Sequence, residues 1–160
     1  MGVSCEACHG PGSEHMSAGG AKAAIVVPTN LPKDRAMMIC GSCHSKGTSK
    51  DKAYPFPVKF RPGDDLTAAF VDAKPTTPGR NQQYSEFITS KHATLGMTCT
   101  LCHSVHGDTS LPDQLKKPVN DLCLGCHMGK IKDLKTHQPT APADATCATC
   151  HMPGGSHAFK

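Results

Sequence analysis

The chain repeats one short pattern five times: Cys-x-x-Cys followed at once by His. The five copies use all ten cysteines and five of the ten histidines in the 160-residue sequence. Two thiols at this spacing can add to the two vinyl groups along one porphyrin edge, and the next imidazole can then bind the iron as proximal ligand. We therefore expect five covalently attached c-type haems. The motifs, numbered 1 to 5 below, are Cys5–His9, Cys40–His44, Cys99–His103, Cys123–His127 and Cys147–His151.

The expected site residues follow directly from the motif. The predicted haem-attaching residues are Cys5, Cys8, Cys40, Cys43, Cys99, Cys102, Cys123, Cys126, Cys147 and Cys150. The predicted proximal iron ligands are His9, His44, His103, His127 and His151. No catalytic residue is predicted.

Other uses of paired cysteines explain the pattern less well. Zinc ribbons use two Cys-x-x-Cys elements for each tetrahedral site, so five elements would leave one unpaired. Disulfide scaffolds and thioredoxin-like sites do not require a histidine after the second cysteine. The recurrence of that histidine in every copy favours haem.

The composition also favours a cofactor in the interior. Hydrophobic residues make up 38% of the chain, tryptophan is absent, and tyrosine and phenylalanine number two and five. An ordinary globular domain is about 45–50% apolar. The predicted fold class is therefore mostly α with much irregular structure, in which short helices wrap around a stacked array of five haems with little or no β-structure.

Several function classes are excluded. No stretch approaches the roughly 18 apolar residues of a membrane span. Seventeen basic residues against thirteen acidic ones are a mild excess, and no basic block suggests nucleic-acid binding. No glycine-rich phosphate-binding loop is present, which argues against a nucleotide site.

The five remaining histidines match the number of expected irons. This equality predicts that every iron has a second, distal imidazole. The predicted distal ligands are His15, His92, His106, His137 and His157. Methionine is the usual competitor for this position, and Met16, Met37, Met38 and Met97 stay open as alternatives.

Three of these histidines are expected to bind neighbouring haems rather than their own. His106 follows His103 by three residues, on the same side of one helical turn, so it cannot easily reach around the porphyrin of motif 3. The segments His9–His15 and His151–His157 share the pattern His-x-Pro-Gly-x-x-His. Pro-Gly turns the backbone and directs the second histidine outward.

The domain organisation is predicted as one pentahaem domain over residues 1–160. Residues 1–45 carry motifs 1 and 2, residues 46–84 form a long irregular connector, and residues 85–160 carry motifs 3 to 5. Within the connector, aromatic side chains are expected to pack over haem faces and edges. These are Tyr54, Phe56, Phe60 and Phe70.

Helices are predicted to be short and attached to the motifs. We expect helices over Lys33–Ser45 and Ser85–His103, the second beginning at Ser85 and open to a break at Gly96. Asn120 and Asp144 are the predicted N-caps of the helices that carry motifs 4 and 5.

Four stretches of the chain resemble the multihaem c-type cytochrome superfamily: Gly2–His15, Arg61–Leu66, Ser90–Gly107 and Cys123–His127. The superfamily includes MtrA- and DmsE-type decahaem conduits, NrfB-type pentahaem donors and octahaem hydroxylamine oxidoreductases. The resemblance implies a mostly helical fold around haems in van der Waals contact. It also implies electron transfer rather than substrate chemistry.

Haem c is attached after export, so we expect a periplasmic or extracellular protein. No signal peptide precedes motif 1 in this sequence, and a functional precursor needs one. This leaves open that the chain is a fragment of a longer one with upstream haems. One of the spare histidines would then bind a haem outside the chain.

The favoured function is a pentahaem electron carrier, not an enzyme, between redox proteins such as a quinol dehydrogenase, a reductase or an outer-membrane cytochrome. The first alternative is a homo-oligomer or an extracellular cytochrome filament in which His15 or His157 crosses a subunit interface. The second is a reductase with one open iron. It is disfavoured because no Cys-x-x-Cys-Lys motif is present and the histidine count fills every iron.

Overall fold

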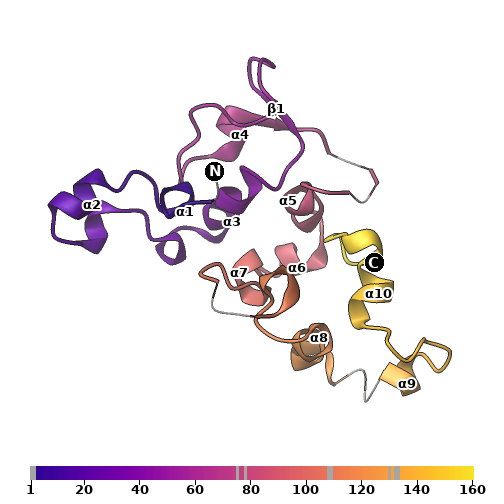
Figure 1. Ribbon diagram of the computed structural model, residues 1–160. Coiled ribbons are helices and arrows are strands. Elements are labelled where there is room, and N and C mark those ends of the chain that lie inside the picture. Colours follow the sequence, from indigo (N-terminus) through magenta and orange to yellow (C-terminus); the bar gives the residue numbers. More distant parts are fainter. Residues whose placement is uncertain (1–2, 75, 78, 108–109, 130, 132–133) are drawn as a thin grey trace.

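Figure 1 shows the computed structural model of the chain, which describes residues 3–74, 76–77, 79–107, 110–129, 131 and 134–160. Its α-helices are α1 (Glu6–His9), α2 (Ser13–Ser17), α3 (Lys33–Gly41), α4 (Leu66–Ala69), α5 (Gln83–Phe87), α6 (Lys91–Thr94), α7 (Cys99–Cys102), α8 (Val119–His127), α9 (Leu134–His137) and α10 (Cys147–His151). The 3₁₀ turns are η1 (Lys22–Ala24), η2 (Pro28–Asn30), η3 (Pro112–Gln114) and η4 (Pro153–Gly155). The strands are β1 (Gly47–Ser49) and β2 (Phe70–Asp72).

Short helices and irregular chain make up most of the described structure, which confirms the predicted fold class. The two strands pair antiparallel, with Gly47 opposite Asp72 and Ser49 opposite Phe70. They form the one sheet found in the described residues. No described helix is long and apolar enough to cross a membrane.

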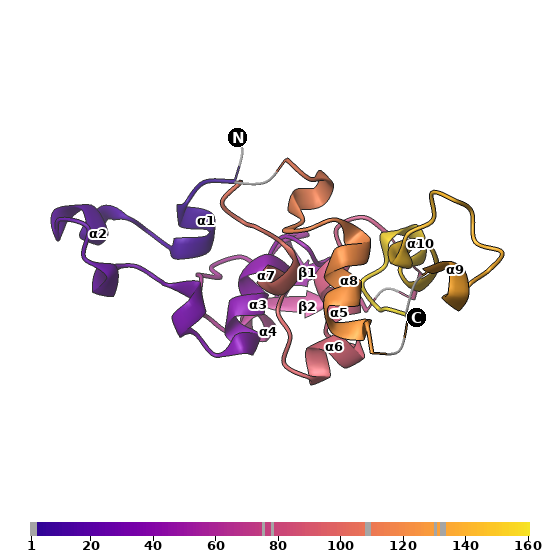
Figure 2. The same ribbon diagram turned by 90° about the horizontal axis from the view of Figure 1, so that it is seen from below.

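The helices that carry the motifs follow one another along the molecule. Motifs 1, 3, 4 and 5 lie in α1, α7, α8 and α10, and motif 2 begins in the last turn of α3. Two views at right angles place α2 near one end of an elongated molecule and α9 near the other, with the motif helices between them in chain order (Figures 1 and 2).

The connector between motifs 2 and 3 is more regular than predicted, because it contains β1, α4 and β2. These elements pack on α3 through a small cluster of Met38, Leu66 and Phe70, with Phe60 and Tyr84 against it. Phe60 and Phe70, which were expected to cover haem, thus pack on protein side chains. Among the described residues only seven hydrophobic side chains are buried, in agreement with the low apolar content.

The helix boundaries agree in part with the sequence-based predictions. Helix α3 begins at Lys33 as predicted but ends at Gly41, before Ser45. The predicted helix over Ser85–His103 is wrong as one element, because α5, α6 and α7 replace it. Gly96 has a φ of +76° and lies in the break between α6 and α7, where a split was expected.

The predicted N-caps are wrong for physical reasons that lie outside the local sequence. Ser85 lies inside α5 and donates its hydroxyl hydrogen to Asp72 Oδ1 at 2.8 Å. Asn120 lies inside α8, and its Oδ1 accepts from the backbone N–H of Cys147 at 2.8 Å. The N-cap of α10 is Thr146, in a reciprocal capping box with Thr149, and not Asp144.

Candidate haem-binding sites

Eight of the ten histidine rings face one another in four pairs of nearly equal separation. Every pair joins one motif histidine to one histidine outside the motifs. The distance between the ring centres and the angle between the ring planes are 6.3 Å and 11° for His9–His106, 6.1 Å and 24° for His103–His157, 6.2 Å and 29° for His137–His151, and 6.1 Å and 88° for His92–His127.

This separation fits an iron between two imidazoles. An imidazole nitrogen binds a metal ion at about 2.0 Å and lies about 1.1 Å from the ring centre, so two imidazoles on opposite sides of one ion have centres about 6.2 Å apart. Aromatic pairs in direct contact span a wider range of about 4.5–7 Å. Because four pairs share one value, the donor set fits bis-imidazole coordination.

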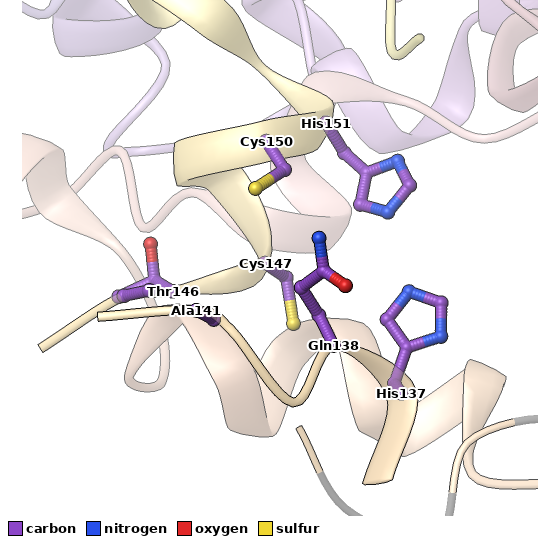
Figure 3. A pocket seen from close by; sticks show the side chains of 8 residues that line it. His137, Gln138, Ala141, Thr146, Cys147, Cys150 and His151 are labelled. Carbon is purple, nitrogen blue, oxygen red and sulfur yellow. The ribbon is translucent and has the colours of Figure 1, made fainter. Parts of the chain in front are cut away.

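Motif 5 shows the fit most directly. A cavity of about 300 Å³ is lined by both motif cysteines and both histidines of the pair, together with Gln138, Ala141, Ala145 and Thr146. In Figure 3, the His137 ring of α9 and the His151 ring of α10 face each other, and Cys147 and Cys150 border the same space. Two thiols beside opposed imidazoles are the protein groups that a c-type haem requires.

Backbone carbonyls orient the motif histidines. The ring Nδ1–H donates to a carbonyl oxygen in three motifs: His9 to Val26 at 2.7 Å, His103 to Asp113 at 2.8 Å and His151 to Lys160 at 2.6 Å. A donor at Nδ1 fixes the tautomer in which Nε2 carries a free lone pair. Metal-binding histidines usually have such a partner, which sets ring orientation and increases ligand basicity.

Two histidines outside the motifs are held in less polar surroundings. Burial lowers the pKa of His92, and the neighbouring His127 lowers it further. Its Nδ1 is buried without a hydrogen-bond partner among the described residues, and its ring packs on Phe159 at 4.4 Å. Burial also lowers the pKa of His157. Both shifts favour the neutral ring that ligation requires.

A buried carboxylate lies beside His157, and nothing in the sequence pattern indicated it. Glu86 is 8% exposed and accepts from the His157 backbone N–H at 2.8 Å and from Gln82 Nε2 at 2.8 Å. It belongs to α5, far from His157 in the chain. Only the tertiary packing brings this charge to the ligand.

Motif 2 differs from the other four motifs. The His44 Nδ1–H donates to the Gln83 side-chain carbonyl oxygen at 3.2 Å. Among the described residues, however, no other histidine ring faces His44, and none faces His15, in α2. The structure therefore pairs all predicted site histidines except these two.

Electrostatic effects between cysteines relate motifs 1, 2 and 3. Burial raises the pKa of the Cys8 thiol, and Cys40 and Cys43 raise it further by their charge. A hydrogen bond between the Cys40 and Cys99 thiols raises the pKa of Cys40 and lowers that of Cys99. The attachment points of motif 2 therefore lie between those of motifs 1 and 3.

The same relationship continues through motifs 3, 4 and 5. Burial raises the pKa of Cys102, and the charge of Cys126 adds to this effect. Burial raises the pKa of Cys123 to about 11, and Cys147 contributes through its charge and a hydrogen bond. The five attachment points thus follow one another in chain order.

The structure describes the surroundings of three of the four methionine alternatives. Met37 and Met38 are buried in α3, and Met38 Sδ accepts from the backbone N–H of Leu66 at 3.4 Å. Met16 is 76% exposed. The described residues hold no group of three or more His, Cys, Asp or Glu side chains suited to a metal ion. The opposed histidine pairs are therefore the arrangement in the described residues that suits an iron.

Comparison with known proteins agrees with this geometry. The family described as "Doubled CXXCH motif" matches residues 92–132, which contain motifs 3 and 4. The multiheme cytochrome MtrA of Shewanella baltica (strain OS185) is 30% identical over 159 residues. That match covers 97% of this chain and 37% of the length of the relative.

Two solved structures share the fold. The outer cell wall cytochrome OcwA has a TM-score of 0.64 at 22% identity, over 99% of this chain and 50% of that one. The undecaheme cytochrome from the S-layer of Carboxydothermus ferrireducens has a TM-score of 0.54 at 22% identity, over 99% of this chain and 33% of that one. The chain thus spans half or less of each relative.

Opposed histidines beside paired thiols, on a helical and irregular scaffold, define a protein that holds haem c covalently. The family match and the MtrA relative support membership of the multihaem c-type cytochrome superfamily.

Proposed function

We propose that the chain is a pentahaem electron carrier and not an enzyme. The observation that carries the proposal is the set of four histidine pairs with ring centres 6.1–6.3 Å apart. Bound haem supplies an iron that alternates between ferric and ferrous states, at a lower potential with two imidazoles than with imidazole and methionine. At the four motifs with such a pair, two protein ligands on the iron would leave no open position for a substrate.

The ring pairs support one distal ligand for each of four motifs. In this proposal His106 serves motif 1, His157 serves motif 3, His92 serves motif 4 and His137 serves motif 5. Three of these ligands, His106, His157 and His92, are far in the sequence from the motif that they serve. Such interleaved ligation ties distant segments together, and it compensates for the small apolar core.

The order of the attachment points supports an electron path from motif 1 to motif 5 or the reverse. The thiols of motifs 1 and 2, and those of motifs 3 and 4, are close enough for the charge of one to raise the pKa of the other. Thiol hydrogen bonds join motif 2 to motif 3 and motif 4 to motif 5. Each thiol would become a thioether at a porphyrin edge, so adjacent thiols place adjacent edges together. Residues 1–160 then act as one domain in which every segment positions part of one array.

The partners in this proposal are redox proteins that exchange electrons at the ends of the array: a quinol dehydrogenase, a reductase or an outer-membrane cytochrome. Contacts of this kind are small and transient. Because haem c is attached after export, we expect the working protein in the periplasm or outside the cell. The two structural neighbours, a cytochrome of the outer cell wall and one of an S-layer, are in keeping with that location.

Haem content and ligation test the proposal. The pyridine haemochrome assay and the intact mass of the matured protein should give five haems for residues 1–160. Each of the substitutions H106A, H157A, H92A and H137A should convert one low-spin ferric haem to high spin in the electron paramagnetic resonance spectrum. M16A, at an exposed position, is the control and should convert none. Fewer than five haems, or four variants without a spin change, would contradict the proposal.

A further inference from the structure

His15 has the local structure of a ligand but no partner ring. It lies half-buried in α2, and its Nδ1–H donates to the Ala21 carbonyl oxygen at 3.0 Å. The motif histidines His9, His103 and His151 have the same type of bond. It leaves Nε2 as the free nitrogen. No second histidine ring is recorded beside it in the part of the chain that the structure describes.

The histidines that follow motifs 3 and 5 obey one rule. His106 comes after motif 3 and faces His9 of motif 1. His157 comes after motif 5 and faces His103 of motif 3. Each trailing histidine therefore pairs with the motif two positions earlier in the chain.

His15 is the trailing histidine of motif 1, and its closest counterpart is His157. Both follow the motif histidine by six residues, in the pattern His-x-Pro-Gly-x-x-His. By the same rule His15 pairs with a motif two positions before motif 1. Such a motif is not among these 160 residues. Figures 1 and 2 both place α2 near one end of the molecule, away from α5 to α10.

Motif 2 supplies the complementary observation. His92 precedes Cys99 of motif 3 by seven residues and faces His127 of the next motif. The corresponding ligand of motif 2 would precede motif 1 by a similar distance, which also falls outside the 160 residues. The unpaired His44 and the unpaired His15 thus point to the same neighbouring segment.

Given the ligand pairing proposed above, on which this inference rests, we propose that His15 is an axial ligand to a haem iron carried by a preceding segment of the polypeptide, and that a histidine of that segment binds opposite His44. Each segment would thus donate one histidine to a haem that the other segment carries. Residues 1–45 are then a junction within a longer haem array. The match of this chain to only 37% of the length of its MtrA relative is in keeping with such an array.

The test uses the complete polypeptide as cells make it, matured with its haems. The substitution H15M is compared with wild type and with M16L, a matched change at the adjacent exposed position. We expect an unchanged haem count, and in H15M alone one haem that gains the absorption band and raised potential of imidazole–methionine ligation. Removal of the motif 2 haem by C40A and C43A should leave that methionine signal in place.

Three results would overturn the inference. Loss of the methionine signal together with the motif 2 haem would mean that His15 binds that haem within the chain. A signal seen only at concentrations where analytical ultracentrifugation detects a dimer would assign the haem to a second copy. No altered haem in H15M would mean that His15 is not a ligand.

A second measurement covers the case in which the protein without motif 2 fails to mature. In the oxidised H15M protein, proton magnetic resonance should show the shifted methionine methyl close to a haem attached outside residues 1–160. Proximity to the thioethers of Cys40 and Cys43 would contradict the inference. An intact haem count, with H106A still losing its own low-spin haem, would show that the pentahaem proposal stands even if this one fails.

Discussion

The rings of His103 and His157 lie 6.1 Å apart and within 24° of parallel, although they belong to motif 3 and to the segment after motif 5. The backbone of His157 is fixed in turn by Glu86 of α5, whose Oε2 accepts its N–H at 2.8 Å. A proposed iron ligand and a buried carboxylate are therefore mechanically and electrostatically linked.

The first prediction concerns this carboxylate. Glu86 places negative charge near motif 3, which favours the ferric state, so E86Q should raise the midpoint potential of that haem. At the effective dielectric constant of a protein, the interaction of this carboxylate with the charge on a nearby iron is on the order of 1 kcal/mol. Potentiometric titration followed by electron paramagnetic resonance measures the shift. E14Q, on exposed α2, should leave the potential unchanged, and an equal shift in both variants would contradict the assignment.

The second prediction concerns the one perpendicular pair. The rings of His92 and His127 are at 88°, whereas the other three pairs lie within 29° of parallel. Perpendicular imidazole planes leave two iron d orbitals nearly equal in energy, which gives a strongly anisotropic low-spin signal with one large g value. We expect one such signal in the oxidised protein. It should be absent from H92A and retained in H137A.

Some of the site follows from the sequence alone, because it depends on covalent chemistry and short spacings. The Cys-x-x-Cys-His motifs identify attachment residues without any knowledge of the fold. The break between α6 and α7 follows from Gly96, since a positive φ suits glycine. The thin core follows from the low apolar content.

The remainder depends on contacts between distant segments. Ser85 was expected to cap a helix, but its hydroxyl donates to Asp72 of β2. Asn120 caps a helix other than its own, through the backbone N–H of Cys147. Tertiary packing also brings His106 opposite His9. It likewise places Glu86 beside His157. Local pattern contains no information about such partners.

The third prediction concerns the cap that positions His92. Ser90 is 2% exposed, and its Oγ accepts from the Ala93 N–H at the start of α6. The substitution S90A removes this bond and should lower the free energy of unfolding by about 1 kcal/mol. Denaturant unfolding followed by circular dichroism measures the change. Because α6 carries His92, the anisotropic signal should also broaden. T94A, at an exposed position of the same helix, should do neither.

The fourth prediction compares two glycines that lie inside motifs. A Cβ on Gly41, in motif 2, would come within 2.7 Å of the Tyr84 ring, whereas a Cβ on Gly125, in motif 4, would meet nothing within 4 Å. The substitution G41A should therefore force α3 and α5 apart and cost about 1–3 kcal/mol of stability, as overpacking does.

The matched substitution G125A should instead be neutral or stabilising by up to about 1 kcal/mol, because alanine favours the interior of α8. Haem content should be equal in the two variants, so that denaturant unfolding compares packing alone. In the double variant G41A/Y84A the clash is absent, and part of the loss should be recovered relative to Y84A. Equal destabilisation by G41A and G125A would mean that the motif itself, rather than the contact with Tyr84, requires glycine.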